Sequence, residues 1–190
     1  MVSVIPFLPS FRWYAVWWRV CREGKPESVA VATANSETGT SGKDFARTVM
    51  RGTDSPTLLS IPIVGGSAAL KREHNIPSAL LSEHGNWRHS HIGTLETIYG
   101  RYPYSGEILA LIRDCYAADE PTLTGFNSTL HHAVTSFLPS PALLREDVSP
   151  AAAERGREVL EKVMPDISII DALMRHGPET TLALLAHSTK

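Results

Sequence analysis

The stretch EHGNWRHSHIGTLETIYGRYP, residues 83–103, marks the change from a strand-rich to a helical part of the chain. Within it, Ile92, Leu95 and Tyr99 are spaced at i, i+3 and i+7, which is the spacing of one buried helix face. Asn86 stands just before this pattern, where its side-chain oxygen can accept hydrogen bonds from free N–H groups of the first turn. We therefore predict a helix that begins after Asn86, with Asn86 as its cap.

Helices are predicted for most of the chain from this stretch onward, because the apolar residues keep the helical period. The predicted ranges are 87–100, 104–117, 121–138, 149–163 and 167–187, the last interrupted at HGPE. Upstream, the pattern predicts strands over 3–8, 28–33, 44–50 and 57–66, and an early aromatic helix over 9–23. Strands followed by helices indicate the α+β class, with a small mixed N-terminal sheet, the aromatic helix and a helical C-terminal half.

Length and composition predict one domain without a nucleic-acid partner. At 190 residues and 43% hydrophobic content, we expect a single domain over 1–190, strand-rich over 1–66 and helical over 86–190. The 18 basic and 20 acidic residues include no basic run, which argues against nucleic acid. Two prolines and two arginines interrupt the apolar N-terminus, so no membrane span is predicted. Cys21 and Cys115 form no C-x-x-C pair, which favours a reducing, cytoplasmic location.

The helix after Asn86 carries two histidines on different faces. His89, Gly93 and Glu96 are spaced at i, i+4 and i+7, and Gly93 leaves a notch between an imidazole and a carboxylate. Two interpretations are open: the notch binds a ligand, or Gly93 admits a neighbouring element and His89 bonds to a backbone carbonyl. His91 falls on a semi-apolar face, where it is either functional or a buried histidine with satisfied hydrogen bonds.

No metal site is predicted. His89 and His91 are about 200° apart around a helix, so they cannot bind one ion together. His131 and His132 diverge similarly, and no H-E-x-x-H, glycine-rich nucleotide loop or G-x-S-x-G motif is present. We expect neither a metal nor another cofactor.

Asp171 lies in the apolar run SIIDALMRHG, so its carboxylate is expected to be half buried and to need a partner. One interpretation is that Asp171 orients a histidine, as carboxylates behind a functional histidine do. The other is a structural role, in which it caps a helix or pairs with a cation.

The stretch 83–103 resembles the signature of the WbqC-like family, in which a Trp, a His a few residues later and a Tyr close to a Pro mark one helix. Three further segments are similar to family segments in the same order: IPFLPSFRWYAVWW, LLSIPIVGG and, in one branch, PDISIIDALMRHGPETTLALL. One departure concerns an Asn-Arg pair on the strand before the sIPv segment of the family. Here FARTVMRGTD keeps Arg51 and has Met50 in the Asn place.

The resemblance implies a role in surface-polysaccharide (O-antigen type) biosynthesis, with transfer of glycine or another amino acid or acyl group onto a sugar. An activated sugar or acyl donor would then be the partner. Acyl transfer needs a base of near-neutral pKa and groups that stabilise an oxyanion. The candidate catalytic residues are His89, ranked first, His91 and Arg51, and the candidate binding residues are Asn86, Trp87, Arg88, Glu96, Tyr99 and Asp171.

Two other function classes stay open. A non-catalytic binding or assembly subunit of the same pathway, pairing as a homodimer, is favoured by Met50 and by the absence of a recognised catalytic motif. A cysteine-dependent hydrolase or acyltransferase would need Cys21 or Cys115 beside a histidine, and neither has that context in the sequence. The enzyme hypothesis predicts that the candidate residues converge on one pocket, whereas the assembly hypothesis predicts that they are scattered or held by other partners.

Overall fold

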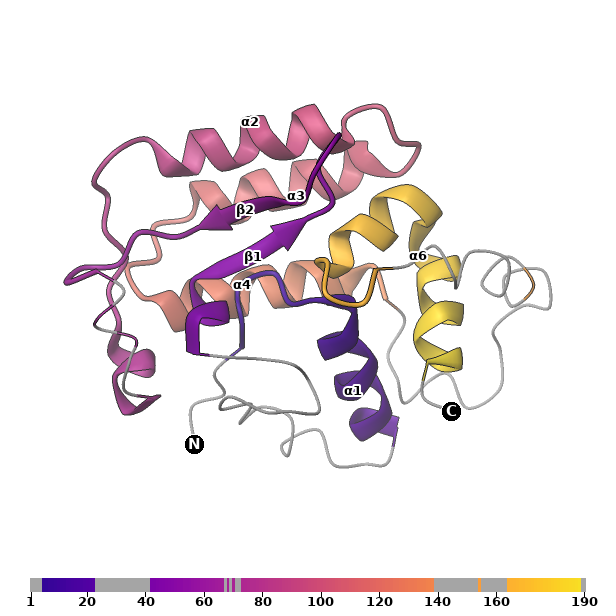
Figure 1. Ribbon diagram of the computed structural model, residues 1–190, viewed down its shortest axis with the longest axis horizontal. Helices are drawn as coiled ribbons and strands as arrows, with labels where there is room; N and C mark the ends of the chain where they lie inside the picture. Colours follow the sequence, from indigo (N-terminus) through magenta and orange to yellow (C-terminus); the bar gives the residue numbers. More distant parts are fainter. Residues whose placement is uncertain are drawn as a thin grey trace.

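The computed structural model describes residues 5–22, 42–66, 68, 70, 73–138, 154 and 164–188 (Figure 1). The described fold is α+β, as predicted, with an early aromatic helix and a helical C-terminal half. Its elements are α1 (Phe11–Arg22), the short 3₁₀ helix η2 (Gly42–Phe45), β1 (Arg47–Met50), β2 (Thr57–Ser60), the 3₁₀ helix η4 (Glu73–Ser78), α2 (Trp87–Tyr99), α3 (Ser105–Ala117), α4 (Leu123–Ser136) and α6 (Ile169–His187).

The two strands form an antiparallel hairpin. Arg47 lies opposite Ser60 at the open end, and the turn lies at the other end. Gly52 begins this turn with a left-handed φ of 69°, and a Cβ there would lie 1.8 Å from the carbonyl oxygen of Ser55. The tight turn therefore needs a glycine at this position.

The predicted strand over 3–8 is wrong in its described part, which carries no strand. Pro6 and Pro9 have no N–H to give to a ladder, and Leu8 adopts a left-handed φ of 38°. The Leu8 carbonyl instead accepts a hydrogen bond of 2.8 Å from the hydroxyl of Thr48 in β1. The segment is therefore tied to the hairpin by a side chain rather than as a third strand.

Most of the other predicted helices and strands are confirmed, and the rest lie outside the described residues. The aromatic helix is confirmed as α1, and two predicted strands contain β1 and β2. Four predicted helices are confirmed as α2, α3, α4 and α6. The predicted strand over 28–33 and, apart from the helical Glu154, the predicted helix over 149–163 lie outside the described residues.

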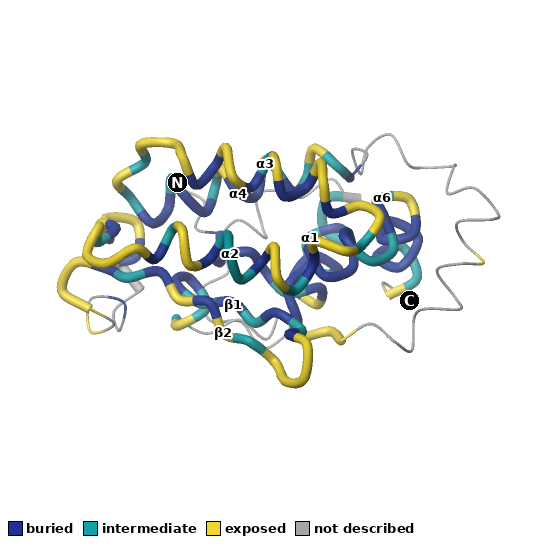
Figure 2. Tube along the Cα trace, turned by 90° about the horizontal axis from the view of Figure 1, so that it is seen from above, coloured by how far each residue is buried: buried dark blue, intermediate teal, exposed yellow. Residues whose placement is uncertain are grey.

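The aromatic helix α1 forms part of the core. Trp13, Tyr14 and Trp18 expose 1% or less of their surface, and the helix packs against α6. These three aromatic side chains are therefore buried by packing. Figure 2 shows buried residues also on the inner faces of α2 and α3, with exposed residues on their outer faces, whereas α6 is buried over most of its length.

In Figure 1, α2 lies above the hairpin and α3 and α4 lie behind it, with α2 against α3 and α3 against α4. The last helix, α6, is kinked at Gly177, with φ 81° and ψ 169°, where the sequence HGPE predicts an interruption. A Cβ at Gly177 would lie 2.6 Å from the ring of Tyr104, so the kink brings the backbone close to the α2–α3 connection. None of the helices in the described ranges is long and apolar enough to cross a membrane.

Asn127 of α4 connects segments that are distant in sequence. Its side-chain Nδ2 donates to the carbonyls of Ile5 at 2.9 Å and Phe45 at 2.8 Å, and the residue is 1% exposed. Phe45 ends η2, two residues before β1 begins. The amide therefore fixes the N-terminal segment and the start of the hairpin against α4.

Replacing Asn127 with Ala is expected to lower the free energy of unfolding by about 2–4 kcal/mol, because two buried carbonyls lose their donor. Chemical denaturation with urea measures this loss. Asn86→Ala is the matched control, since Asn86 is exposed and its side chain makes no capping bond, and a change within about 0.5 kcal/mol is expected there. Equal effects of the two substitutions would contradict the role given to Asn127.

Candidate functional site

A cavity of about 410 Å³ lies between the turn of the hairpin, the C-terminal end of α2 and α6. Arg51, a predicted catalytic residue, lines this cavity. Tyr99 and Asp171, two predicted binding residues, lie behind the lining side chains. The residues that line it are Arg51, Gly52, Thr53, Asp54, Ser55, Pro56, Ile98, Tyr102, Met164 and Arg175. We call it the arginine–aspartate pocket.

Two guanidinium groups share one buried carboxylate at this pocket. Arg175 Nε donates to Asp171 Oδ1 at 2.7 Å, and Arg51 Nε lies 3.8 Å from Asp171 Oδ2. Asp171 is 6% exposed, so its carboxylate depends on these cations for compensation of its buried charge. Of the two interpretations of Asp171 given above, this pairing matches the one in which the carboxylate pairs with a cation. Asp54 also lines the pocket, so the two guanidinium groups are balanced by two carboxylates, Asp171 and Asp54.

Tyrosines hold the cluster in place. The Arg175 guanidinium lies over the ring of Tyr102, 4.3 Å from its centroid, and also donates to the Tyr102 hydroxyl. Tyr99 is fully buried, and its hydroxyl donates to the sulfur of Met50 at 3.8 Å. Burial, and then the negative charge of Asp171, raise the pKa of Tyr99, so its hydroxyl stays protonated. Tyr99 supports the pocket from behind and is not a base.

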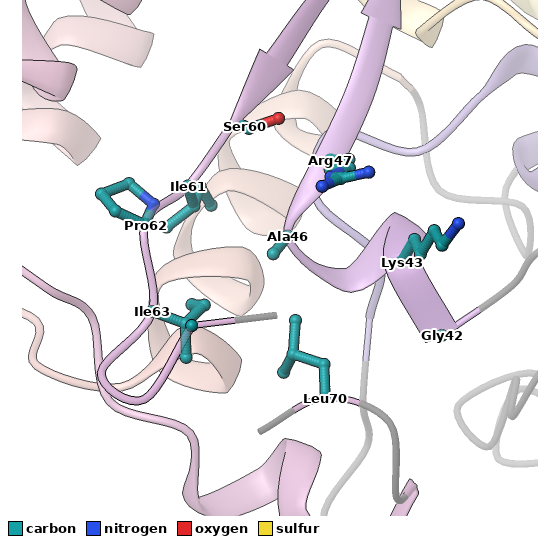
Figure 3. Close-up of a pocket in the computed structure, with 10 residues that line it drawn as sticks. Gly42, Lys43, Ala46, Arg47, Ser60, Ile61, Pro62, Ile63 and Leu70 are labelled. Carbon is teal, nitrogen blue, oxygen red and sulfur yellow. The ribbon is translucent and has the colours of Figure 1, made fainter. Parts of the chain in front are cut away.

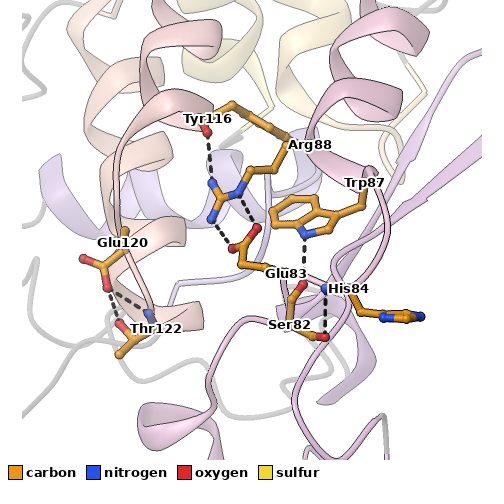
Figure 4. A network of polar contacts seen from close by, with 8 residues as sticks. All are labelled: Ser82, Glu83, His84, Trp87, Arg88, Tyr116, Glu120 and Thr122. Atoms are coloured by element: carbon orange, nitrogen blue, oxygen red, sulfur yellow. Dashed lines mark hydrogen bonds and ion pairs between the residues drawn. The ribbon is translucent and has the colours of Figure 1, made fainter.

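The start of α2, which carries most of the predicted site, is a separate network (Figure 4). Arg88 donates to both carboxylate oxygens of Glu83, at 2.9 and 3.3 Å, and to the carbonyl of Tyr116 at 3.0 Å. Trp87 Nε1 donates to the Ser82 carbonyl at 3.0 Å. The Arg88 guanidinium also lies 4.7 Å from the centroid of the Trp87 ring. These contacts close the loop before α2 onto α3.

The predicted side-chain cap at Asn86 is wrong. Asn86 occupies the N-cap position, but its side chain makes no capping hydrogen bond, with φ −107° and ψ 44°. Its backbone carbonyl instead accepts hydrogen bonds from the N–H and the hydroxyl of Ser90. The free N–H groups of the first turn therefore receive no hydrogen bond from the Asn86 side chain.

His89 and His91 lie in opposite environments. His89 is exposed, whereas His91 is 6% exposed and its Nδ1 lies 3.1 Å from the hydroxyl of Tyr116. Burial lowers the pKa of His91 to about 4, although a hydrogen bond with the backbone of Ser60 acts in the opposite direction. The His91 ring is therefore neutral at pH 7 and has hydrogen-bond partners, as the structural interpretation predicts.

The helix face at Gly93 is open. A Cβ built at Gly93 would meet no described atom within 4 Å, so no neighbouring element approaches the helix there. Glu96 pairs with Arg113 of α3 at 2.7 Å rather than with His89. The interpretation that Gly93 admits a neighbouring element is therefore wrong, whereas ligand binding at this face stays a prediction.

The predicted site residues thus form two groups at opposite ends of α2. Arg51, Tyr99 and Asp171 come together at the C-terminal end, while the residues from Asn86 to His91 lie at the N-terminal end. At 1.5 Å per residue, His89 and Tyr99 are separated by about 15 Å along the helix axis. The predicted convergence of His89 with Arg51 on one pocket is not seen.

Two residues of the pocket were missed by the sequence analysis, Arg175 and Tyr102. Arg175 follows Asp171 by four positions, which on a helix places a cation beside a carboxylate. That spacing was available in the sequence as a signal. Tyr102 gave no such signal, because its place depends on how the α2–α3 connection meets α6.

Neither cysteine has the properties of a nucleophile. Burial raises the pKa of the Cys21 thiol to about 11 and also raises that of Cys115. Cys115 donates to the Thr129 carbonyl at 3.9 Å. Within the described ranges, no group of three or more His, Cys, Asp or Glu side chains is placed to hold a metal ion.

A model of the WbqC-like protein family matches residues 41–146, more than half of the chain. The chain belongs to the WbqC-like family. The match covers the hairpin and helices α2, α3 and α4, and therefore includes Arg51 and the candidate residues of α2, whereas Asp171 and Arg175 lie outside it. Comparison with curated proteins and with solved structures gave no match.

The stability of this WbqC-like protein is expected to fall as the pH is lowered from 7 to 4. Burial depresses the pKa values of His91 and His131 from 6.5 to about 4, so the unfolded chain binds more protons between these pH values. The expected loss is roughly 3 kcal/mol for each ring. Urea denaturation at a series of pH values measures it.

The substitution His91→Gln is expected to remove the contribution of His91 to the loss of unfolding free energy, so that stability depends less on pH. His89→Gln, on the exposed face of the same helix turn, is the control and is expected to leave the dependence unchanged. If His91→Gln keeps the full slope between pH 7 and pH 4, the buried neutral state assigned to His91 is wrong.

Proposed function

We propose that this WbqC-like protein is a transferase of surface-polysaccharide (O-antigen type) biosynthesis that moves glycine, or another amino acid or acyl group, onto a sugar. Membership of the family supports the pathway. The observation that carries the substrate class is the arginine–aspartate pocket, where two guanidinium groups at a 410 Å³ cavity share a single carboxylate. Guanidinium groups of this kind bind a carboxylate or stabilise an oxyanion.

The pocket also has a feature suited to an amino acid. Asp54 lines it and is exposed, so a ligand with an ammonium group next to a carboxylate would meet charge of opposite sign at both ends. Transfer would form a bond between the acyl carbon and a nitrogen or oxygen of the sugar. The bond from the acyl carbon to the donor's leaving group would break, and the proton of the acceptor would pass to a base.

His89 is the first proposed base because it is exposed to solvent, and His91, which is buried and bonded to Tyr116, is the second. Neither lines the arginine–aspartate pocket. The proposal also includes a cytoplasmic location, an activated sugar or acyl donor as partner, and pairing into a homodimer. Light scattering of the purified protein tests the last point.

A second function is favoured by the separation of the candidate residues. His91 and Arg88 are held by structural partners, and Arg51 lies at the far end of α2 from both. This scatter supports a non-catalytic subunit that binds an acidic ligand of the same pathway. Met50, which stands where the family pattern has Asn, is fully buried against Tyr99 and so contributes packing rather than chemistry.

Binding of free glycine is expected to weaken at least tenfold in Arg51→Gln, because one of the two guanidinium groups is lost. Isothermal titration calorimetry measures the dissociation constant. Arg51 is the better position to change, since its 3.8 Å contact leaves the closer Arg175–Asp171 pair intact. Arg47→Gln removes the same charge outside this pocket and is expected to leave glycine binding unchanged. Equal weakening in both variants would refute the assignment of this pocket.

A transfer assay separates the two functions. The full chain is incubated with a glycyl thioester and a nucleotide-linked amino sugar, and the acylated sugar is detected by mass spectrometry. Product that is lost in His89→Ala, with glycine binding retained, supports the transferase. Glycine binding without product in the wild-type protein supports the binding subunit.

A further inference from the structure

A second cavity, of about 860 Å³, opens at the other end of the hairpin (Figure 3). Its wall comes from η2, the start of β1 and the chain that follows β2. The volume lies within the roughly 300–1,000 Å³ that is typical of small-molecule sites. None of the residues considered for the transferase site lines this cavity, which we call the hairpin-base pocket.

Two cations from adjacent elements line the hairpin-base pocket. Lys43 comes from η2 and is exposed, and Arg47 is the first residue of β1 and is half-buried. Within the described part of the chain, neither forms an ion pair, whereas Arg51, Arg88 and Arg175 each do. Because no carboxylate neutralises them there, Lys43 and Arg47 are available to a ligand with two or more negative charges.

The rest of the wall is largely apolar. Ile61, Ile63 and Leu70 expose 4%, 7% and 7% of their surfaces and line the cavity (Figure 3). The N–H of Gly66 already donates to the Ile63 carbonyl at 2.8 Å, so this backbone group is not available to an anion. Recognition of charge therefore falls to the two basic side chains, and the apolar wall suits a ring next to the charged group.

We propose that the hairpin-base pocket binds a diphosphate-bearing ligand of nucleoside diphosphate size. Lys43 and Arg47 contact the phosphates, and the base or sugar ring packs on Ile61, Ile63 and Leu70. Inorganic phosphate or pyrophosphate alone would use the cations but would leave the apolar wall uncovered. The proposal goes beyond the transferase function, because it requires neither group transfer nor the arginine–aspartate pocket.

Isothermal titration calorimetry of the full chain with UDP, ADP and sodium pyrophosphate tests the proposal. At least one nucleotide is expected to bind, and more tightly than pyrophosphate does. Its dissociation constant is expected to rise at least tenfold in Arg47→Gln and in Lys43→Gln, and to rise with salt concentration, because the contacts are ionic. Both side chains reach solvent, so neither substitution is expected to prevent folding; thermal melts without ligand verify this.

Arg101→Gln is the matched control, because Arg101 is exposed in the α2–α3 connection and lies outside both pockets. Nucleotide binding is expected to be unchanged in this variant. Three results would overturn the proposal. They are no binding of either nucleotide to the wild-type protein, equal weakening in Arg101→Gln, and pyrophosphate binding as tight as that of the nucleotides.

Discussion

The carboxamide of Asn127 is the contact on which the arrangement of the other elements depends. Both of its N–H groups are used, one on the N-terminal segment at Ile5 and one on η2 at Phe45. Neither carbonyl belongs to a regular strand or helix ladder, so neither would find a substitute donor in a purely apolar core. By setting where η2 ends, the amide also sets where β1 starts, and with it the positions of Arg47 and Arg51 at the two ends of that strand.

The distribution of paired and unpaired cations distinguishes the two ends of the hairpin. At the turn, Arg51 and Arg175 are organised by Asp171 and by Tyr102, so the charge is held in a fixed geometry. At the base, Lys43 has no carboxylate partner among the described residues and is open to solvent. A short strand of four residues, about 14 Å long at roughly 3.4 Å per residue, thus separates guanidinium groups held by a carboxylate from a lysine that is open to solvent.

Much of the fold could be predicted from the sequence, because apolar periodicity reports directly on helices. The helices α2, α3 and α4 and the break of α6 at Gly177 follow from local patterns. The failed strand over 3–8 shows the limit of this approach, since its apolar residues are buried by long-range contacts although two prolines exclude a ladder.

The candidate site was less predictable than the fold for a related reason. Tertiary packing decides which charged groups meet. The pairing of Arg175 with Asp171 is local and visible at i+4, whereas the approach of Arg51 to the same carboxylate depends on how the hairpin is placed against α6. The spacing of His89 and His91 predicts that they lie on different faces of the helix. Their distance from Arg51 could not be predicted in this way.

The placement of Ser168 has a consequence for the order in which the chain can fold. Ser168 forms an isolated bridge with Ser10, and its N–H donates to the carbonyl of Val49 in β1. On both sides of it, the Phe11 N–H bonds to Ile167 and the Ile169 N–H bonds to Pro9. During synthesis, these three backbone hydrogen bonds can therefore form only after residues 167–169 have left the ribosome.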